Sequence, residues 1–403
     1  NLEKDSKGHI WIVDHFNQII HFSSDIKVLE TYKVTSESHS IPSNQINCLY
    51  SENDNIWVGT MNQGFFRFNI SPKIVKYLFK EDPGLNELGK VQVLSMTKGK
   101  QNEIIIGTSN HTIFIYNEKT RKLKKIITEE DNIYRVYYEE KNNKIIYGTY
   151  STQLKSIDLN TFKIKNEITF PFASAVHGIT SNDSLIFVAP WSQGLIANDR
   201  YGNNIIKITE PWQRDFSTLH LLHDGDIIWL ATYKNGVVSY NIRTNEMKSH
   251  LLTDQSNERF LSNQVDIITK LHNGDILICT NEDGVCSIDK DNFTIKKVGK
   301  NIGLDKLHIK SIFEDSENNV WIVTEQKIIK TDINFNNYTE ITFYDGLFSG
   351  IEHLASCFQK ETNKIFIGGQ QGVQFLIPFD VITNNNPNNV VITDLRIFEK
   401  KIE

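Results

Sequence analysis

Two tryptophans, with the aromatic and basic residues near them, carry side chains that could bind a sugar. Trp191 lies between two apolar runs, and Trp212 is followed two positions later by Arg214. Tyr233 and Lys234 come directly after the next apolar run. An aromatic ring offers a flat apolar face to a sugar ring, while arginine and lysine can hold a carboxylate or a sulfate. These five residues are the candidates for a ligand-binding site.

The elements that would position these residues belong to a repeat that occurs nine times. Each copy contains a turn, three or four apolar residues, often a small residue, another turn and a second apolar run. Successive copies are 41 to 48 residues apart, and a period of about 40–45 residues with short strands is the signature of propeller blades. The central position of the first apolar run is occupied by Trp11, Trp57, Ile105, Ile146, Phe187, Trp229, Leu277, Trp321 and Phe366.

The third copy shows how each unit divides into four strands. Its predicted strands cover 91–96, 103–107, 112–116 and 123–127, and turn-forming residues separate them. The second strand of each unit is apolar at nearly every position, as expected for a sheet covered on both faces by its neighbours. The predicted fold class is therefore all-β, a β-propeller built from four-stranded antiparallel blades.

The number of blades in the closed ring depends on the last unit, which has no obvious fourth strand before the linker 384–389. Segment 73–78 can supply that strand if the third to ninth units form a seven-bladed ring over 72–383. Residues 1–71 would then be two blades of a preceding propeller, and 390–403 the first strand of a truncated β-sandwich. A single nine-bladed ring is the competing arrangement, and it exceeds the usual four to eight blades.

The meander of each blade predicts where the candidate residues gather. The loop between the second and third strands emerges on the same rim as the connection from an outer strand to the next inner strand. Trp191, Tyr233 and Lys234 lie in loops of the first kind, and Trp212 and Arg214 lie in a connection of the second kind. We expect one exposed sector that binds a ligand. The alternatives are that these loops pack on each other or contact the neighbouring propeller.

Catalytic and metal-binding motifs are missing from the sequence pattern. His220 and His223 are three apart in a predicted inner strand, so they point to opposite faces and chelate poorly. There is no His-Glu-x-x-His motif, no paired Cys-x-x-Cys, no Gly-x-Ser-x-Gly elbow and no phosphate-binding glycine loop. Asp315 is expected to stabilise a turn through its own backbone. We therefore expect no catalytic residue, no metal and no cofactor in this region.

Composition narrows the classes of partner. The net charge of −6 does not provide the basic field that nucleic acid requires. The basic run 119–125 falls where the exposed outer strand of a blade is expected. Four cysteines are too few for a disulfide scaffold, although Cys279 and Cys286 flank a hairpin turn and could pair. No stretch approaches the ~20 apolar residues of a membrane span. The chain begins inside a repeat, so we expect it to be a piece of a longer protein.

The repeat Asp-x-x-Gly-x-Ile-Trp-Ile/Val-Gly-Thr, followed by a second apolar strand, resembles the two-component regulator propeller repeat. The nearest copies are 5–13, 53–68, 224–240 and 315–323. The terminal segment 387–398 looks like the start of the β-sandwich that follows the propellers in that family. The resemblance covers nearly the whole chain.

This resemblance implies the periplasmic sensor region of a Bacteroidetes hybrid two-component system. In that family two propellers and a β-sandwich precede a membrane helix, a histidine kinase and a DNA-binding response regulator. It implies detection of oligosaccharides from polysaccharide breakdown, contacts with other domains of the same protein, a homodimeric parent, and kinase activity and membrane contact only outside this fragment. The alternatives are a propeller enzyme acting on glycans, a lyase or glycosidase, and a protein-interaction platform without a small ligand.

Overall fold

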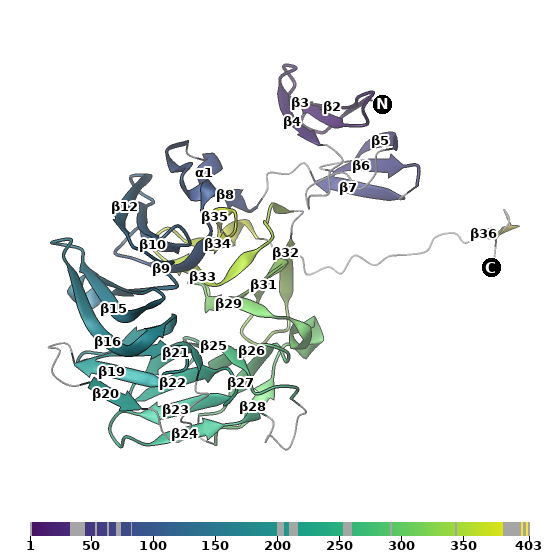
Figure 1. The fold of residues 1–403 in the computed structure, drawn as a ribbon. Helices are drawn as coiled ribbons and strands as arrows, with labels where there is room; N and C mark the ends of the chain where they lie inside the picture. The colour runs from purple at the N-terminus through teal and green to yellow at the C-terminus, as the bar shows by residue number, and fades with distance from the viewer. Residues whose placement is uncertain are drawn as a thin grey trace.

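In the computed structural model the described part of the chain is all-β, with eight four-stranded sheets, one three-stranded sheet and one two-stranded sheet (Figure 1). Among the described residues the single α-helix is α1 (Leu78–Glu81), and no helix there has the length and apolarity to cross a bilayer. The structure describes residues 2–32, 45–52, 55–62, 64–69, 74–81, 83–199, 205–208, 217–252, 260–290, 292–342, 345–381, 396–397 and 400–401.

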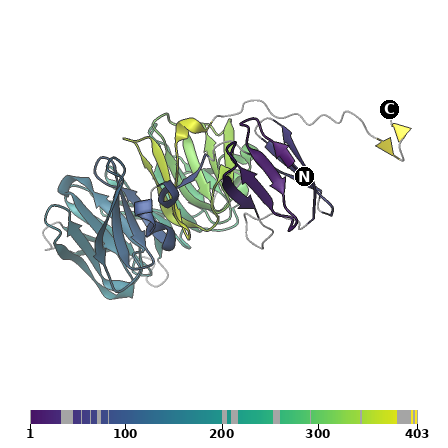
Figure 2. The same cartoon turned by 90° about the horizontal axis from the view of Figure 1, so that it is seen from above.

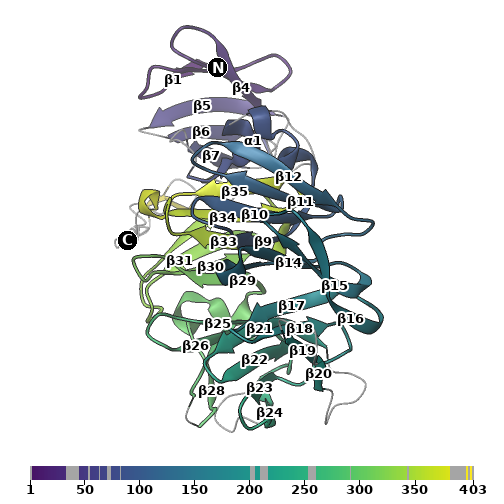
Figure 3. The same ribbon diagram turned by 90° about the vertical axis from the view of Figure 1, so that its left-hand side faces the viewer.

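Seven of the four-stranded sheets form a closed ring around a common axis (Figures 1 and 3). Each inner strand contacts the inner strands of the two neighbouring sheets, including β33 with β9. The inner strands are β9 (Val93–Lys98), β13 (Arg135–Glu139), β17 (Val176–Ser181), β21 (Thr218–Asp224), β25 (Val265–Lys270), β29 (Ile309–Glu314) and β33 (Ile351–Gln359).

The other strands continue each meander outwards, and all pairs within the sheets are antiparallel. The second strands are β10 (Glu103–Thr108), β14 (Lys144–Gly148), β18 (Leu185–Pro190), β22 (Ile227–Thr232), β26 (Ile276–Thr280), β30 (Val320–Thr324) and β34 (Lys364–Gly369). The third strands are β11 (Thr112–Asn117), β15 (Ser151–Asp158), β19 (Leu195–Asp199), β23 (Val237–Asn241), β27 (Val285–Ile288), β31 (Lys327–Thr331) and β35 (Gly372–Leu376). The outer strands are β12 (Lys122–Thr128), β16 (Ile164–Ser174), β20 (Ile205–Ile208), β24 (Met247–His250), β28 (Ile295–Lys297), β32 (Tyr338–Thr342) and β8 (Lys76–Tyr77).

The ring is closed by a strand from before its first blade. β8 pairs with β35, with Tyr77 opposite Gln374 and Lys76 opposite Phe375. The last blade therefore gains its outer strand from the predicted donor segment 73–78, and the edge of β35 is covered. The seven-bladed ring is confirmed, and the nine-bladed alternative is wrong. The domain boundaries 1–71 and 72–383 stay predictions, and the linker 384–389 lies outside the described residues.

The first two repeats form their own pair of sheets outside the ring (Figures 1 and 2). They share a core to which Trp11, Ile19, Leu49 and Ile56 belong. The four-stranded sheet contains β1 (Leu2–Lys4), β2 (Ile10–Val13), β3 (Ile19–Phe22) and β4 (Val28–Tyr32), and the three-stranded sheet contains β5 (Ile46–Glu52), β6 (Asn55–Thr60) and β7 (Phe65–Asn69).

The terminal segment 390–403 is described only in part. It contains β36 (Arg396–Ile397), paired antiparallel with β37 (Lys400–Lys401). The other residues of this segment lie outside the described part of the chain, so the start of a β-sandwich stays a prediction.

The repeated central position is a packing position. Trp11, Phe187, Trp321 and Phe366 are at most 1% exposed. Trp, Phe, Ile and Leu interchange there because each fills the space between neighbouring sheets with a similar apolar volume. None of the four cysteines forms a disulfide, so the alternative pairing of Cys279 with Cys286 is wrong.

Candidate functional site

Three of the five predicted site residues come together on one rim of the ring. Trp191 follows β18 and Tyr233 follows β22, and their ring centroids are 5.7 Å apart at an interplanar angle of 56°. Both side chains reach solvent, with 36% and 40% of their surface exposed. Lys234 places its Nζ 5.9 Å from the centroid of the Tyr233 ring. The rim therefore presents two aromatic surfaces and a cation in one sector.

Backbone hydrogen bonds hold the two loops in place. The Trp191 N–H donates to the Ala175 carbonyl at 2.9 Å, and the Ser174 hydroxyl donates to the Trp191 carbonyl at 2.8 Å. The Tyr233 N–H donates to the Ser217 carbonyl at 2.9 Å. Each loop is thus tied to the segment that leads into an inner strand, which keeps the aromatic pair on the rim without a ligand.

The other two predicted site residues, Trp212 and Arg214, fall in the connection between β20 and β21. Both lie outside the described residues. Their share in the site therefore stays a prediction.

A half-buried guanidinium, that of Arg135, stands behind the aromatic pair, at the start of the inner strands. The rings of His177 and Trp191 are 5.4 Å apart, and Arg135 donates from Nε to the His177 carbonyl at 2.6 Å. Burial lowers the pKa of Arg135 to about 10, which leaves it charged at pH 7. Burial, and then repulsion from Arg135, lowers the pKa of His177 to about 4, so this imidazole is neutral.

Two further histidines lie on the inner strands. His220 Nδ1 is 3.0 Å from the Ile268 carbonyl, and burial followed by repulsion from Arg135 lowers its pKa to about 3. Burial also holds the pKa of His353 well below its usual value, with added repulsion from Arg135. His353 Nε2 is buried and has no hydrogen-bond partner within the described residues. His177, His220 and His353 are therefore neutral imidazoles, and each is repelled by the charge of Arg135.

Polar pairs link neighbouring inner strands near the same rim. His308 Nε2 is 3.3 Å from Asp266 Oδ2, and Gln264 donates to Asp266 Oδ1 at 2.8 Å. Gln92 donates to Glu352 Oε1 at 2.5 Å. These contacts pair polar side chains that the ring brings toward its axis.

A cavity of about 610 Å³ lies on the ring axis and is lined by residues of all seven inner strands. Its volume is within the usual range of ligand pockets. It reaches from Arg135 and His220 to His272 and Lys360, which lie in or next to the turns between inner and second strands. Because inner strands run away from the Trp191 rim, these turns form the opposite rim.

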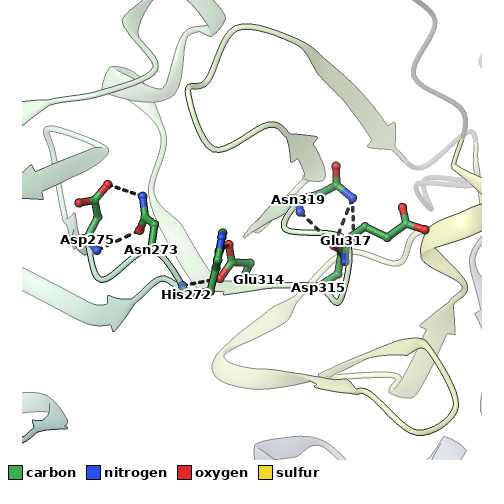
Figure 4. A network of polar contacts seen from close by, with 7 residues as sticks. All are labelled: His272, Asn273, Asp275, Glu314, Asp315, Glu317 and Asn319. Carbon is green, nitrogen blue, oxygen red and sulfur yellow. Dashed lines mark hydrogen bonds and ion pairs between the residues drawn. The ribbon is translucent and has the colours of Figure 1, made fainter.

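Figure 4 shows two turns of that opposite rim, where acidic side chains shape the backbone. His272 donates its backbone N–H to Glu314 at 2.8 Å, and its Nδ1 lies 2.5 Å from the same carboxylate. Asp315 accepts the backbone N–H groups of Glu317 and Asn319, both at 2.9 Å. The prediction that Asp315 stabilises its own turn is confirmed, because its carboxylate accepts hydrogen bonds from the backbone of that turn.

His220 and His223, which the sequence placed on opposite faces of a strand, contact different groups. His223 Nε2 is 2.8 Å from the Gly225 carbonyl, whereas His220 contacts β25 of the neighbouring blade. A different group does have metal-binding distances: Asp5, His9 and His21 of the first sheet.

The sequence reasoning missed Arg135, His177 and His353. Each stands within the first three positions of an inner strand, in a segment that is otherwise largely apolar. Aligning the nine repeats on their inner strands, instead of on the tryptophan position, would have shown ionisable residues recurring where the strands meet the axis.

The comparisons with known proteins agree with this architecture. A model of the family described as two component regulator propeller matches residues 40–62. The chain is 23% identical over 369 residues to Histidine kinase P4 of Formosa agariphila, which covers 85% of this chain and 25% of that protein. It thus spans about a quarter of the length of that relative.

Solved structures show the same fold. The extracellular domain of a putative hybrid two component system from B. thetaiotaomicron is 16% identical, with a TM-score of 0.66 covering 100% of this chain and 56% of that one. Virginiamycin B lyase from Staphylococcus aureus is 13% identical, with a TM-score of 0.58 covering 73% of this chain and 96% of that one. The resemblance to the propeller-containing sensor region of hybrid two-component systems, drawn from the repeat, is confirmed.

Proposed function

We propose that this chain is an extracytoplasmic ligand-sensing module of a hybrid two-component system, which binds oligosaccharides from polysaccharide breakdown and signals to a histidine kinase. The similarity to a histidine kinase and to extracellular sensor domains supports the sensor role and the location. The observation that carries the ligand class is the exposed pair Trp191 and Tyr233 with Lys234 beside it.

The geometry of the pair suits a sugar more than a purely apolar ligand. Two rings at 56° can contact two successive sugar units of a bent chain, one on each face. Aromatic faces bind the apolar side of a sugar, and polar groups around them bind its hydroxyls. Lys234 adds a cation that would favour uronic or sulfated sugars.

In this proposal the region itself is not an enzyme, and kinase activity belongs to the longer protein. Signalling requires that the sugar bind one arrangement of the domains better than another. We place the module in the periplasm, in a homodimer, in contact with other domains of the same chain. A propeller can equally host an enzyme or a protein platform, so the fold does not choose among them.

The test is a calorimetric and thermal-shift screen of neutral, uronic and sulfated oligosaccharides. A hit should weaken at least about tenfold in Trp191→Ala and Tyr233→Ala, because each loses one aromatic contact. Lys234→Gln should weaken only charged ligands. Tyr338→Ala is the matched control, because Tyr338 is a similarly exposed aromatic on the outer strand β32.

Three outcomes contradict the proposal at different levels. Affinity that survives both aromatic changes moves the site elsewhere. Turnover of the sugar indicates a glycan-degrading enzyme, the first alternative. A complete lack of stabilisation by any sugar, together with capture of a protein partner, favours the interaction platform.

A further inference from the structure

Three potential metal ligands meet in the first sheet, far along the chain from the rim site. Asp5 follows β1, His9 stands in the turn before β2, and His21 lies in β3 directly opposite Trp11. These residues form no local metal-binding motif, and from the sequence we expect no metal. Strand pairing brings them together.

Their donor atoms form a triangle of the size that a tetrahedral metal ion requires. His9 Nδ1 is 3.1 Å from His21 Nε2 and 3.6 Å from Asp5 Oδ2, and His21 Nε2 is 4.0 Å from the same oxygen. Zinc bonds of about 2.0–2.1 Å at tetrahedral angles separate neighbouring ligand atoms by about 3.3–3.4 Å. Closing the longest side by about 0.6 Å would complete the geometry.

Three hydrogen bonds orient the Asp5 carboxylate so that it could bind a metal ion. Asp5 Oδ1 accepts the backbone N–H groups of Lys7 and His9, both at 2.9 Å. Asp5 Oδ2 accepts the indole N–H of Trp11 at 2.9 Å, which leaves a second lone pair on that oxygen for a ligand. Hydrogen bonds of this kind orient metal-binding groups and raise their affinity.

The histidines are also positioned, and one of them opens the site to solvent. The His21 ring stacks on Trp11 at 3.9 Å and 15°. The Asp5 side chain is fully buried, His21 is 13% exposed and His9 is 27% exposed. An ion can therefore enter past His9 and keep a water as its fourth ligand, and two imidazoles with one carboxylate suit zinc.

We propose that Asp5, His9 and His21 bind a Zn²⁺ ion that joins β1, the turn and β3 of the first sheet. The competing explanation is a simple hydrogen bond between the two imidazoles, which share a 3.1 Å contact. Metal binding and this hydrogen bond make different predictions, because only the former needs all three side chains.

The chain contains a matched site that lacks the ligands. Asp315 bonds Trp321 as Asp5 bonds Trp11, but Asn319 stands in the place of His9 and Lys330 in the place of His21. Replacing His9 with Asn therefore gives the first turn a residue that the same backbone conformation already accommodates.

The experiment is titration of tag-free, chelator-treated protein with ZnCl₂ by calorimetry, and with CoCl₂ by visible absorption. We expect one equivalent of Zn²⁺ per chain and tetrahedral cobalt bands. His9→Asn and His21→Gln should each weaken binding at least about tenfold. His15→Asn, in the turn between β2 and β3 and outside the triad, should leave binding unchanged.

The proposal is overturned if no Zn²⁺ binds at millimolar concentration, or if both ligand variants bind as the wild type does. Circular dichroism of the metal-free variants checks that they fold. Should either variant unfold, Cu²⁺ electron paramagnetic resonance of the wild type decides: coupling to two nitrogens supports the site, and coupling to none overturns it. Sugar binding at the Trp191 rim is independent of either result.

Discussion

Two turns of this protein share an aspartate–tryptophan hydrogen bond and a backbone conformation, but they differ in the side chains at two neighbouring positions. In the first sheet and in the blade of β29 and β30, an aspartate accepts two backbone N–H groups and an indole N–H six residues later, at 2.9 Å from Trp11 and 2.7 Å from Trp321. The third residue after each aspartate has a positive φ, 79° at Gly8 and 65° at Asn318. The aspartate–tryptophan bond is therefore a device of the repeat, independent of any ligand.

The two turns differ at the fourth residue after the aspartate and at the residue that pairs with the tryptophan across the sheet. The first turn has His9 and His21 there. The second has Asn319, and it has Lys330, whose Nζ donates to the Pro378 and Val381 carbonyls at 3.2 Å. One turn thus offers nitrogen ligands, while the other ties the end of the last blade to its neighbour. A repeat can change the role of a turn at these two positions without changing its backbone.

The largest expected loss of stability comes from removing the aspartate that hydrogen-bonds the turn and the tryptophan. Asp315→Ala removes the acceptor of two backbone N–H groups and leaves the buried Trp321 indole unsatisfied. It should lower the free energy of unfolding by about 2–4 kcal/mol, measured by urea denaturation. Asp226→Ala is the control, because Asp226 is an exposed turn residue whose carboxylate pairs with the exposed Arg243, and it should cost less than about 0.5 kcal/mol. Equal losses would refute the structural role of Asp315.

A smaller loss of stability should distinguish a buried tryptophan whose indole N–H is hydrogen-bonded from one whose indole N–H is not. Trp321→Phe keeps an aromatic ring but removes the donor to Asp315, and should cost about 1–2 kcal/mol. Trp229 is buried too, yet its Nε1 has no partner within the described residues. Trp229→Phe should therefore be close to neutral, because it removes an unsatisfied donor. Similar melting-temperature losses in both variants would contradict the comparison.

The smallest effect is the acid sensitivity of the first turn. Burial raises the pKa of Asp5, but hydrogen bonds from Trp11 and from the His9 and Lys7 backbone outweigh it, so the net pKa lies below 3.8. A lowered pKa in the folded state adds stability at higher pH, and this is lost as pH falls through the folded pKa. Asp5→Asn, which cannot ionise, should flatten the decline of melting temperature in metal-free protein below pH 4. Parallel pH profiles for wild type and variant would argue against it.

The sequence predicted the features that depend on local pattern. Period and alternation indicated four-stranded blades, and the missing last strand indicated the donor segment that contains β8. The meander also predicted that Trp191 and Tyr233 share a rim, because loops of the same type emerge on the same side.

Contacts that depend on strand register could not be predicted in this way. His9, in the turn before β2, and His21, in β3, are twelve residues apart, and only the pairing of Trp11 with His21 brings them to one carboxylate. Arg135 and His177 belong to different blades and meet because the ring closes around its axis.

The sequence by itself therefore determined the architecture, since hydrophobic periodicity and turn residues act over a few positions. Tertiary structure alone decided which ionisable side chains meet: the neutral histidines near Arg135 and the three ligands beside Trp11. The physical reason is that strand pairing within a blade and packing between blades bring together residues 12 to 42 positions apart, and a local pattern carries no information about a partner at that distance.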